Sequence, residues 1–245
     1  MDNKIQQLID EALECINEDN IEEGEKKLLE AANLGSTEAK FYLGMFYTIE
    51  KEDREASLYW TKQAVDEGNA DAALLLVSSY INEDGEYSNK EEALYWLQKA
   101  CDLGNAEAQF YLGQIYGEGE IVEADHDKAL QLIMLSAENG YDEAQYELGE
   151  EYLSGDILEK NKEQAIYWLT KAAEQNYQAA KLALANIYCE DGNPDGVNMI
   201  IALAEEEYWF AQNQLAEMYE KGIYVEKDLE KAKYWKELAG DNTLE

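Results

Sequence analysis

The single histidine of the chain comes closest to a catalytic or metal-binding pattern. His126 stands between Asp125 and Asp127, and an imidazole beside carboxylates could relay a proton or bind a metal ion. Among the 54 Asp and Glu residues, chance alone brings some pairs within acid–base distance, and no pair is distinguished by its spacing. The sequence also lacks a GxSxG elbow, a phosphate-binding loop and an HExxH motif. We therefore predict no catalytic residues and no enzymatic activity, with His126 a solvated residue of a loop between helices.

The cysteines and the acidic loops give no pattern of metal ligands either. Cys15, Cys101 and Cys189 are far apart, form no C-x-x-C pair, and are predicted to be reduced, buried thiols. Two loops gather oxygen ligands around glycine, at residues 82–86 (NEDGE) and 191–196 (DGNPDG), but neither has the spacing of a calcium-binding loop. We expect no bound metal and no cofactor.

The charge of the chain restricts its partners. It has 54 acidic residues against 19 Lys and Arg, a formal net charge of −35, whereas a surface that follows a phosphate backbone is basic. We expect no nucleic acid partner and instead a basic protein or peptide, because the charge would accelerate that encounter.

No run reaches the ~18 apolar residues of a membrane span, and residues 1–20 lack the pattern of a secretory signal. These features predict no membrane insertion and a cytoplasmic location.

An internal repeat accounts for most of the chain. Residues 105–140 and 141–176 align without a gap at 36 residues. Each unit begins with an alanine: Ala39, Ala72, Ala108, Ala144, Ala180 and Ala211. A leucine follows four positions later: Leu43, Leu76, Leu112, Leu148, Leu184 and Leu215. A tyrosine stands eight positions after the alanine: Tyr47, Tyr80, Tyr116, Tyr152, Tyr188 and Tyr219. Because these offsets share one helical face, each unit is predicted to begin with an amphipathic helix that packs this face into a core.

A second apolar stripe in each unit predicts a second helix. It has a large residue at Trp60, Trp96, Leu132, Trp168 and Trp235, and a small one four positions later at Ala64, Ala100, Ser136, Ala172 and Ala239. Gly68, Gly104 and Gly140 fall where a helix ends in a left-handed residue, and Gly119, Gly155 and Gly222 fall between the two helices of a unit. Each repeat is therefore predicted to be an α-helical hairpin, with the tyrosines, tryptophans and small residues in its core.

These residues resemble those of a known repeat. The run YEKGIYVEKDLEKAKYW at 219–235 is similar to the Sel-1-like repeat, a relative of the tetratricopeptide repeat, and it matches that pattern at Tyr219, Gly222, Val225, Asp228, Lys231, Ala232 and Trp235. The resemblance implies an all-α fold, a right-handed α-α superhelix (solenoid) of about six hairpins plus an N-terminal capping hairpin. The predicted segments are a cap at 1–35, a solenoid at 36–240 with repeats 36–68, 69–104, 105–140, 141–176, 177–207 and 208–240, and a tail at 241–245.

Three segments depart from the repeat pattern. The repeat at 36–68 is shortened by three residues and lacks the loop glycines. The repeat at 177–207 is shortened by five residues and has Met199 in place of the tryptophan. The cap has Ala12 and Cys15 at the positions of the glycine and the tyrosine, as expected of a terminal repeat with a solvated outer face.

The resemblance also indicates where a partner would bind, because the first helices of tetratricopeptide-type solenoids line a concave groove. Offsets 3 and 6 after the leading alanine point away from the packed face and are the best contact candidates: Tyr42, Met45, Leu75, Ser78, Tyr111, Gln114, Glu147 and Glu150. Offset 2, at Phe41, Phe110 and Tyr146, is a weaker candidate because this position is often aromatic for packing. The same face continues in the last two repeats through Asn186, Glu190, Asn213, Gln214, Glu217 and Lys221. We expect the contact between residues 38 and 154, with apolar residues first and acidic residues after them.

The predicted function is that of an adaptor or scaffold that binds a protein or peptide, expected to be basic, in this groove. One alternative is an immunity-type antagonist that neutralises a basic toxin or enzyme, and a second is a hydrolase with an unrecognised site. The sequence does not identify the partner, because a fold supplies no function by itself.

Overall fold

The computed structural model describes residues 2–80 and 89–241, so the acidic loop at 82–86 lies outside the described residues. Over the described ranges the chain forms fourteen α-helices and no strand, which confirms the all-α prediction. The chain divides into two compact units, which we call unit 1 (residues 1–139) and unit 2 (residues 140–245).

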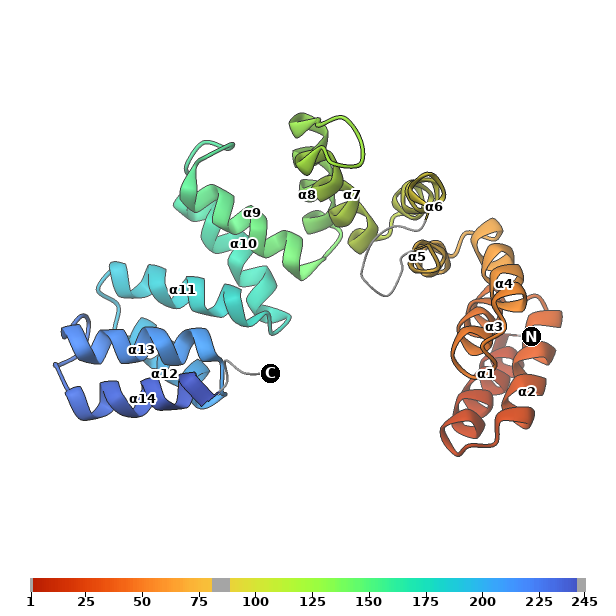
Figure 1. The fold of residues 1–245 in the computed structure, drawn as a ribbon, viewed down its shortest axis with the longest axis horizontal. Coiled ribbons are helices and arrows are strands. Elements are labelled where there is room, and N and C mark those ends of the chain that lie inside the picture. Colours follow the sequence, from red (N-terminus) through yellow and green to blue (C-terminus); the bar gives the residue numbers. More distant parts are fainter. Residues whose placement is uncertain (1, 81–88, 242–245) are drawn as a thin grey trace. The chain divides into compact units, whose positions relative to one another are not determined.

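Successive helices pair into hairpins within each unit (Figure 1). Unit 1 contains α1 (Asp2–Asn17), α2 (Ile21–Asn33), α3 (Thr37–Ile49), α4 (Arg54–Asp66), α5 (Ala70–Ser78), α6 (Lys90–Asp102), α7 (Ala106–Glu118) and α8 (His126–Glu138). Unit 2 contains α9 (Asp142–Ser154), α10 (Lys162–Glu174), α11 (Gln178–Glu190), α12 (Asp195–Glu205), α13 (Trp209–Lys221) and α14 (Leu229–Asp241). We call the odd-numbered helix of each hairpin its first helix and the even-numbered helix its second.

The small residues and leucines of the repeat form the core, as predicted. All six leading alanines are 0% exposed, and the six leucines four positions later are at most 5% exposed. Small residues at the next position bring the two helices of a hairpin together. A Cβ atom added at Gly149 of α9 would lie 2.7 Å from Cγ of Leu169 in α10, so the helices are in contact there.

The repeat tyrosines are less buried than the core assignment predicts. Tyr47, Tyr116 and the four equivalent tyrosines are all half-buried, and several pack the ring against a core cluster. Tyr47 donates a hydrogen bond from its hydroxyl to the Glu25 carboxylate at 2.6 Å. Burial, followed by this carboxylate, raises the pKa of Tyr47 to about 12. The prediction missed this because a phenol packs through its ring and keeps its hydroxyl beside a polar partner.

Capping residues define where the second helices begin. The N-cap side chains of α4, α6, α8 and α10 accept hydrogen bonds from backbone N–H groups two or three residues on, through Asp53, Asn89, Asp125 and Asn161. At the other end, Gly68, Gly104 and Gly140 have positive φ values of 95°, 89° and 97°, as predicted. Asn176 and Glu207 adopt the same left-handed conformation after α10 and α12, with φ values of 69° and 64°.

The shortened hairpin of α11 and α12 contains a close contact between the backbones of its two helices. Gly196 near the start of α12 is buried, and an added Cβ would lie 2.5 Å from the carbonyl oxygen of Ala185 and 2.6 Å from the backbone nitrogen of Cys189. The equivalent position is alanine in α6, α8, α10 and α14. The repeat that is shortened by five residues therefore also has a contact between helix backbones that only glycine permits.

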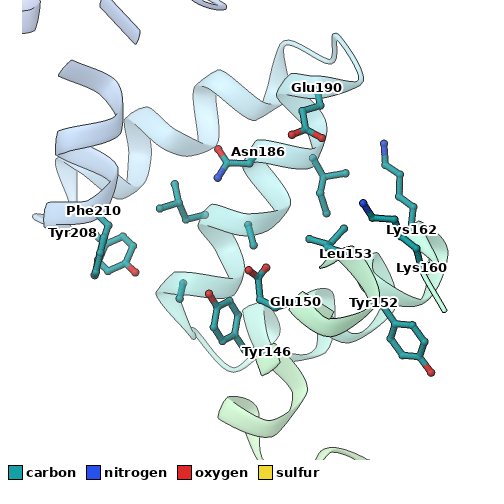
Figure 2. Close-up of a pocket in the computed structure, with 14 residues that line it drawn as sticks. Tyr146, Glu150, Tyr152, Leu153, Lys160, Lys162, Asn186, Glu190, Tyr208 and Phe210 are labelled. Carbon is teal, nitrogen blue, oxygen red and sulfur yellow. The ribbon is translucent and has the colours of Figure 1, made fainter. Parts of the chain in front are cut away.

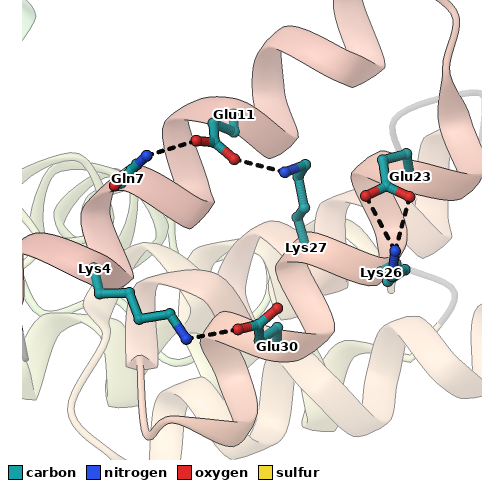
Figure 3. Close-up of polar contacts among 7 residues, drawn as sticks. All are labelled: Lys4, Gln7, Glu11, Glu23, Lys26, Lys27 and Glu30. Atoms are coloured by element: carbon teal, nitrogen blue, oxygen red, sulfur yellow. Dashed lines mark hydrogen bonds and ion pairs between the residues drawn. The ribbon is translucent and has the colours of Figure 1, made fainter.

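Ion pairs join α1 and α2 at the N-terminal end of the chain (Figure 3). Lys4 contacts Glu30 at 2.8 Å, and Lys27 contacts Glu11 at 2.6 Å. The hydrogen bond from Lys27 lowers the pKa of Glu11, with a smaller effect from Gln7. These two helices form a hairpin at the place predicted for the cap.

Two predicted residue environments need correction. Cys101 and Cys189 are buried free thiols, as expected, but Cys15 is only half-buried. His126 is solvated, as expected, but it is the first residue of α8 instead of a loop residue, because Asp125 caps the helix directly before it. The carboxylate of Asp125 accepts a hydrogen bond from the backbone N–H of Lys128, so it has a structural role at the start of α8.

Candidate functional site

The predicted contact residues of unit 1 are accessible on its first helices. Ser78 and Tyr111 are exposed, while four others are half-buried: Tyr42, Met45, Leu75 and Gln114. Phe110 is 1% exposed, so it packs in the interior and offers no contact surface. Phe41 is half-buried and packs against the core that includes α5 and α7. Contact with a partner through offsets 3 and 6 stays a prediction.

In unit 2 the same face is hollowed into a pocket of about 640 Å³ (Figure 2). Three first helices line it, with Tyr146 and Glu150 from α9, Asn186 and Glu190 from α11, and Phe210 from the start of α13. The predicted contact residue Glu150 is therefore a pocket residue. Glu147, its predicted neighbour, is half-buried and does not line this pocket. The pocket extends beyond residue 154, where we expected the contact region to end.

Glu150 is a half-buried carboxylate inside this pocket. Burial raises its pKa, because the charged form loses contact with water. Within the described part of the chain, no group donates a hydrogen bond to this carboxylate or forms an ion pair with it. Such a carboxylate would be stabilised by a cation that enters the pocket.

Aromatic rings line the same pocket as this carboxylate. The rings of Tyr146 and Tyr177 have centroids 5.2 Å apart, and Tyr208 and Phe210 have centroids 5.5 Å apart. Burial raises the pKa of Tyr146 to about 12, with smaller contributions from Glu150, Tyr177 and Tyr208. Tyr146 and Glu150 are four residues apart on α9 and therefore lie on the same face of this helix.

Lysines line another part of the same pocket. Lys162 forms an ion pair with Asp191, and Lys160 lies in the loop between α9 and α10. Figure 2 shows both lysines near Leu153, on the far side of the pocket from Tyr208 and Phe210. We call the part of the pocket that is lined by Tyr146, Glu150 and Tyr208 the tyrosine end.

A second depression of about 740 Å³ adjoins α13. It is lined by residues of the predicted face, among them Asn213, Glu217 and Lys221. Four of its polar side chains are already paired within the chain, because Gln214 donates to Asn186 and Lys221 binds Glu217. The tyrosine end is therefore the better candidate for recognising a charged group.

The sequence interpretation missed Tyr177, Tyr208 and Phe210. The first two stand three positions before the leading alanine, at the N-cap of their helices, where the repeats of unit 1 have serine or asparagine. This change of residue type is a signal that the sequence contains. The pocket itself was not predictable, because it depends on how three hairpins pack together.

Among the described residues, neither a membrane span nor a cluster of metal ligands accompanies the site. No described helix is long and apolar enough to span a membrane. Within residues 2–80 and 89–241, no group of three or more His, Cys, Asp or Glu side chains is arranged to hold a metal ion.

Comparison with protein families decides which family contains this chain. Five segments match the Sel1 repeat, at residues 37–69, 71–105, 106–141, 142–177 and 209–243. The chain belongs to the Sel1 repeat family. The family model leaves out the hairpin of α11 and α12, although the structure forms it, because this repeat is shortened and lacks the tryptophan.

Solved structures support the same Sel1 solenoid fold. A Sel1 repeat protein from Oxalobacter formigenes is 29% identical with a TM-score of 0.72, over 98% of this chain and 72% of that one. A protective antigen of uropathogenic Escherichia coli with this fold is 26% identical with a TM-score of 0.73, over 89% of this chain and 48% of its own length. An immunity protein from Pseudomonas aeruginosa, 18% identical over 76% of this chain and 73% of that one with a TM-score of 0.51, shows the fold alone. Among curated proteins no match was found. Sel1 repeat proteins are generally scaffolds for protein interactions.

Proposed function

We propose that this Sel1 repeat protein binds a basic protein or peptide through the face that its first helices present, and that it does so without catalysis. The observation that carries the proposal is the pocket of unit 2, in which Glu150 lies half-buried with no partner among the described residues. A carboxylate held in this way is unfavourable in the free protein, and a cation from a partner would relieve it. Family membership supports protein binding in general.

The overall charge supports a basic partner. The formal net charge of −35 attracts a basic protein over long range, and the attraction weakens as salt screens it. The accessible residues of unit 1, among them Tyr42, Met45 and Leu75, add apolar contact area on that unit. Apolar anchors supply most of the affinity in such interfaces, whereas charges supply rate and selection.

Affinity capture from native cell extract tests the proposal. We would compare the wild-type protein with a variant that carries Glu147→Lys and Glu150→Lys, at low and at high salt. The double reversal should weaken capture of the main partner and flatten its salt dependence. A matched control carries Glu174→Lys and Glu205→Lys, two exposed positions on the second helices of the same unit. It changes the net charge equally, so it should affect capture much less.

Equal losses in the two variants would mean that net charge alone drives the capture, and would contradict a binding face on the first helices. Unchanged capture by both would contradict a role for the acidic surface.

The charge also favours a more specific candidate, an immunity-type antagonist that neutralises a basic toxin or enzyme. A single tight and salt-sensitive basic partner, whose activity falls when this protein is added, would support the antagonist. Several weaker partners would support the scaffold. Hydrolysis of any substrate in a screen of the purified protein would contradict the non-catalytic part of the proposal.

A further inference from the structure

The first helices of the two units begin with different residues. In unit 1 the N-cap side chains of α3, α5 and α7 accept a backbone hydrogen bond at 3.1, 2.7 and 2.7 Å, through Ser36, Asn69 and Asn105. In unit 2 the N-cap residues of α9, α11 and α13 are Tyr141, Tyr177 and Tyr208, and none of them makes a side-chain cap. A lost cap costs about 1 kcal/mol of helix stability. Three successive losses, each to tyrosine, indicate that these side chains have another role.

One of these tyrosines lines the pocket, and a second packs against a ring that does. The ring centroid of Tyr177 lies 5.2 Å from that of Tyr146, and Tyr208 lines the pocket with its ring centroid 5.5 Å from that of Phe210. Tyr146 stands four residues before Glu150 on α9, so these two side chains share one helical face. The tyrosine end thus combines aromatic faces with hydroxyl oxygens that can accept hydrogen bonds.

Glu150 supplies the charge at this end. Its carboxylate is half-buried, and in the described part of the chain nothing pairs with it. Glu147, Glu143 and Asp142 add to the negative field, since they affect the pKa of Tyr177 after its burial, which is the larger cause. The pocket lysines lie near Leu153 instead (Figure 2).

A carboxylate among aromatic faces matches the chemistry of an arginine side chain. The guanidinium group is planar, stacks on aromatic rings and donates two parallel hydrogen bonds to a carboxylate. It is also more weakly hydrated than an ammonium group, so entering a half-buried site is less costly. Lysine offers a point charge without the planar face.

We propose that the tyrosine end, lined by Tyr146, Glu150 and Tyr208 with Tyr177 packed against Tyr146, binds the guanidinium group of an arginine on the protein partner. The assignment of this arginine to a protein partner rests on the proposed function. The recognition of a guanidinium group rests on the pocket alone. The Glu150 carboxylate forms the ion pair, and the tyrosine rings and hydroxyls enclose the planar group.

The test uses the full-length protein and small probes, so that no partner needs to be known. NMR spectra of protein with ¹³C-labelled glutamate and tyrosine would be recorded during titration with N-acetyl-arginine amide. The matched probes are N-acetyl-citrulline amide, which is isosteric but neutral, and N-acetyl-lysine amide. The arginine probe should shift the signals of Glu150 and Tyr146 in a saturable way and lower the pKa of Glu150. Citrulline should bind at least about tenfold more weakly, and lysine should bind measurably more weakly than arginine.

Two variants separate recognition from folding. Glu150→Gln keeps the shape of the side chain and should reduce arginine affinity about tenfold, by removing the ion pair. Tyr208→Asn should also weaken binding while the protein stays folded. The backbone at Tyr208 (φ −71°, ψ 102°) is close to that of the capping Asn69 (φ −77°, ψ 112°), so asparagine there can cap α13 and offset part of the packing lost.

Several results would overturn the inference: equal responses to arginine and citrulline, equal affinity for arginine and lysine, or unchanged arginine affinity in both variants. These results are distinct from failure of the proposed function. If capture identifies a partner but the arginine probe does not bind, only the arginine site is wrong. If the probe binds but no protein is captured, the site stands and the proposed function fails.

Discussion

Replacing Gly196 by alanine should destabilise the hairpin of α11 and α12. An alanine Cβ at this position would lie 2.5 Å from the carbonyl oxygen of Ala185, 2.6 Å from the backbone nitrogen of Cys189 and 2.7 Å from its sulfur. Two of these three atoms belong to the backbone of α11. Rotation of a side chain therefore cannot relieve the contact, and the two helices have to move apart.

The expected loss follows from two opposing effects. Overpacking of a well-packed core costs about 1–3 kcal/mol, and the upper half of this range suits a contact with backbone atoms. Alanine offsets at most about 1 kcal/mol, because it favours the helix more than glycine does. The Gly196→Ala variant should therefore be about 1–2 kcal/mol less stable than the wild type.

Urea unfolding followed by far-ultraviolet circular dichroism measures this loss. The matched control is Gly117→Ala in the last turn of α7, where an added Cβ meets its nearest neighbour, Cβ of Ala129, at 3.7 Å. With room for the methyl group, the control should gain about 0.5–1 kcal/mol. If Gly196→Ala matches or exceeds the wild type while the control behaves as stated, the close approach of α11 and α12 is wrong.

Two further predictions concern titratable groups. Burial raises the pKa of Glu150 in the folded state, so ionisation of this carboxyl opposes folding. The protonated carboxyl therefore favours the folded state, fully below its ordinary pKa of 4.5, and this stabilisation is lost as pH rises through the raised pKa. Glu150→Gln should therefore be more stable than the wild type at pH 7, by a few tenths to about 1 kcal/mol because water still reaches the carboxylate, with the difference vanishing in thermal melts near pH 4. A thiol reagent should modify Cys15 well before the other two cysteines, since Cys101 and Cys189 are buried and burial raises the pKa of Cys101 to about 12. Equal rates for all three thiols in the folded protein would contradict the burial described here.

The hairpins were predictable because each one is determined by contacts within its own repeat. Alanine and leucine spacing predicts the buried face of every first helix, and the left-handed positions at Gly68 and Gly104 follow from their place after the second stripe. The half-buried position of Tyr47 was not predictable from spacing, because it depends on a carboxylate supplied by α2.

The pocket was predictable only in part, because spacing within one repeat does not determine the contacts between repeats. Glu150 follows from the outward face of α9, which a helical wheel gives. Tyr208 and Phe210 reach the same pocket from α13, so their role depends on how α9, α11 and α13 pack. A wheel describes one helix and carries no information on packing between hairpins.

The N-cap position of each first helix can change without disturbing the core. In a repeat array each hairpin contacts only its neighbours, so a substitution there alters one local helix start and leaves the buried alanines and leucines of the other repeats in place. Tyr141, Tyr177 and Tyr208 show this position occupied three times by a residue that gives up a cap. Selection can therefore alter recognition one hairpin at a time, and the same site offers a protein engineer a set of interchangeable positions for redesigning specificity.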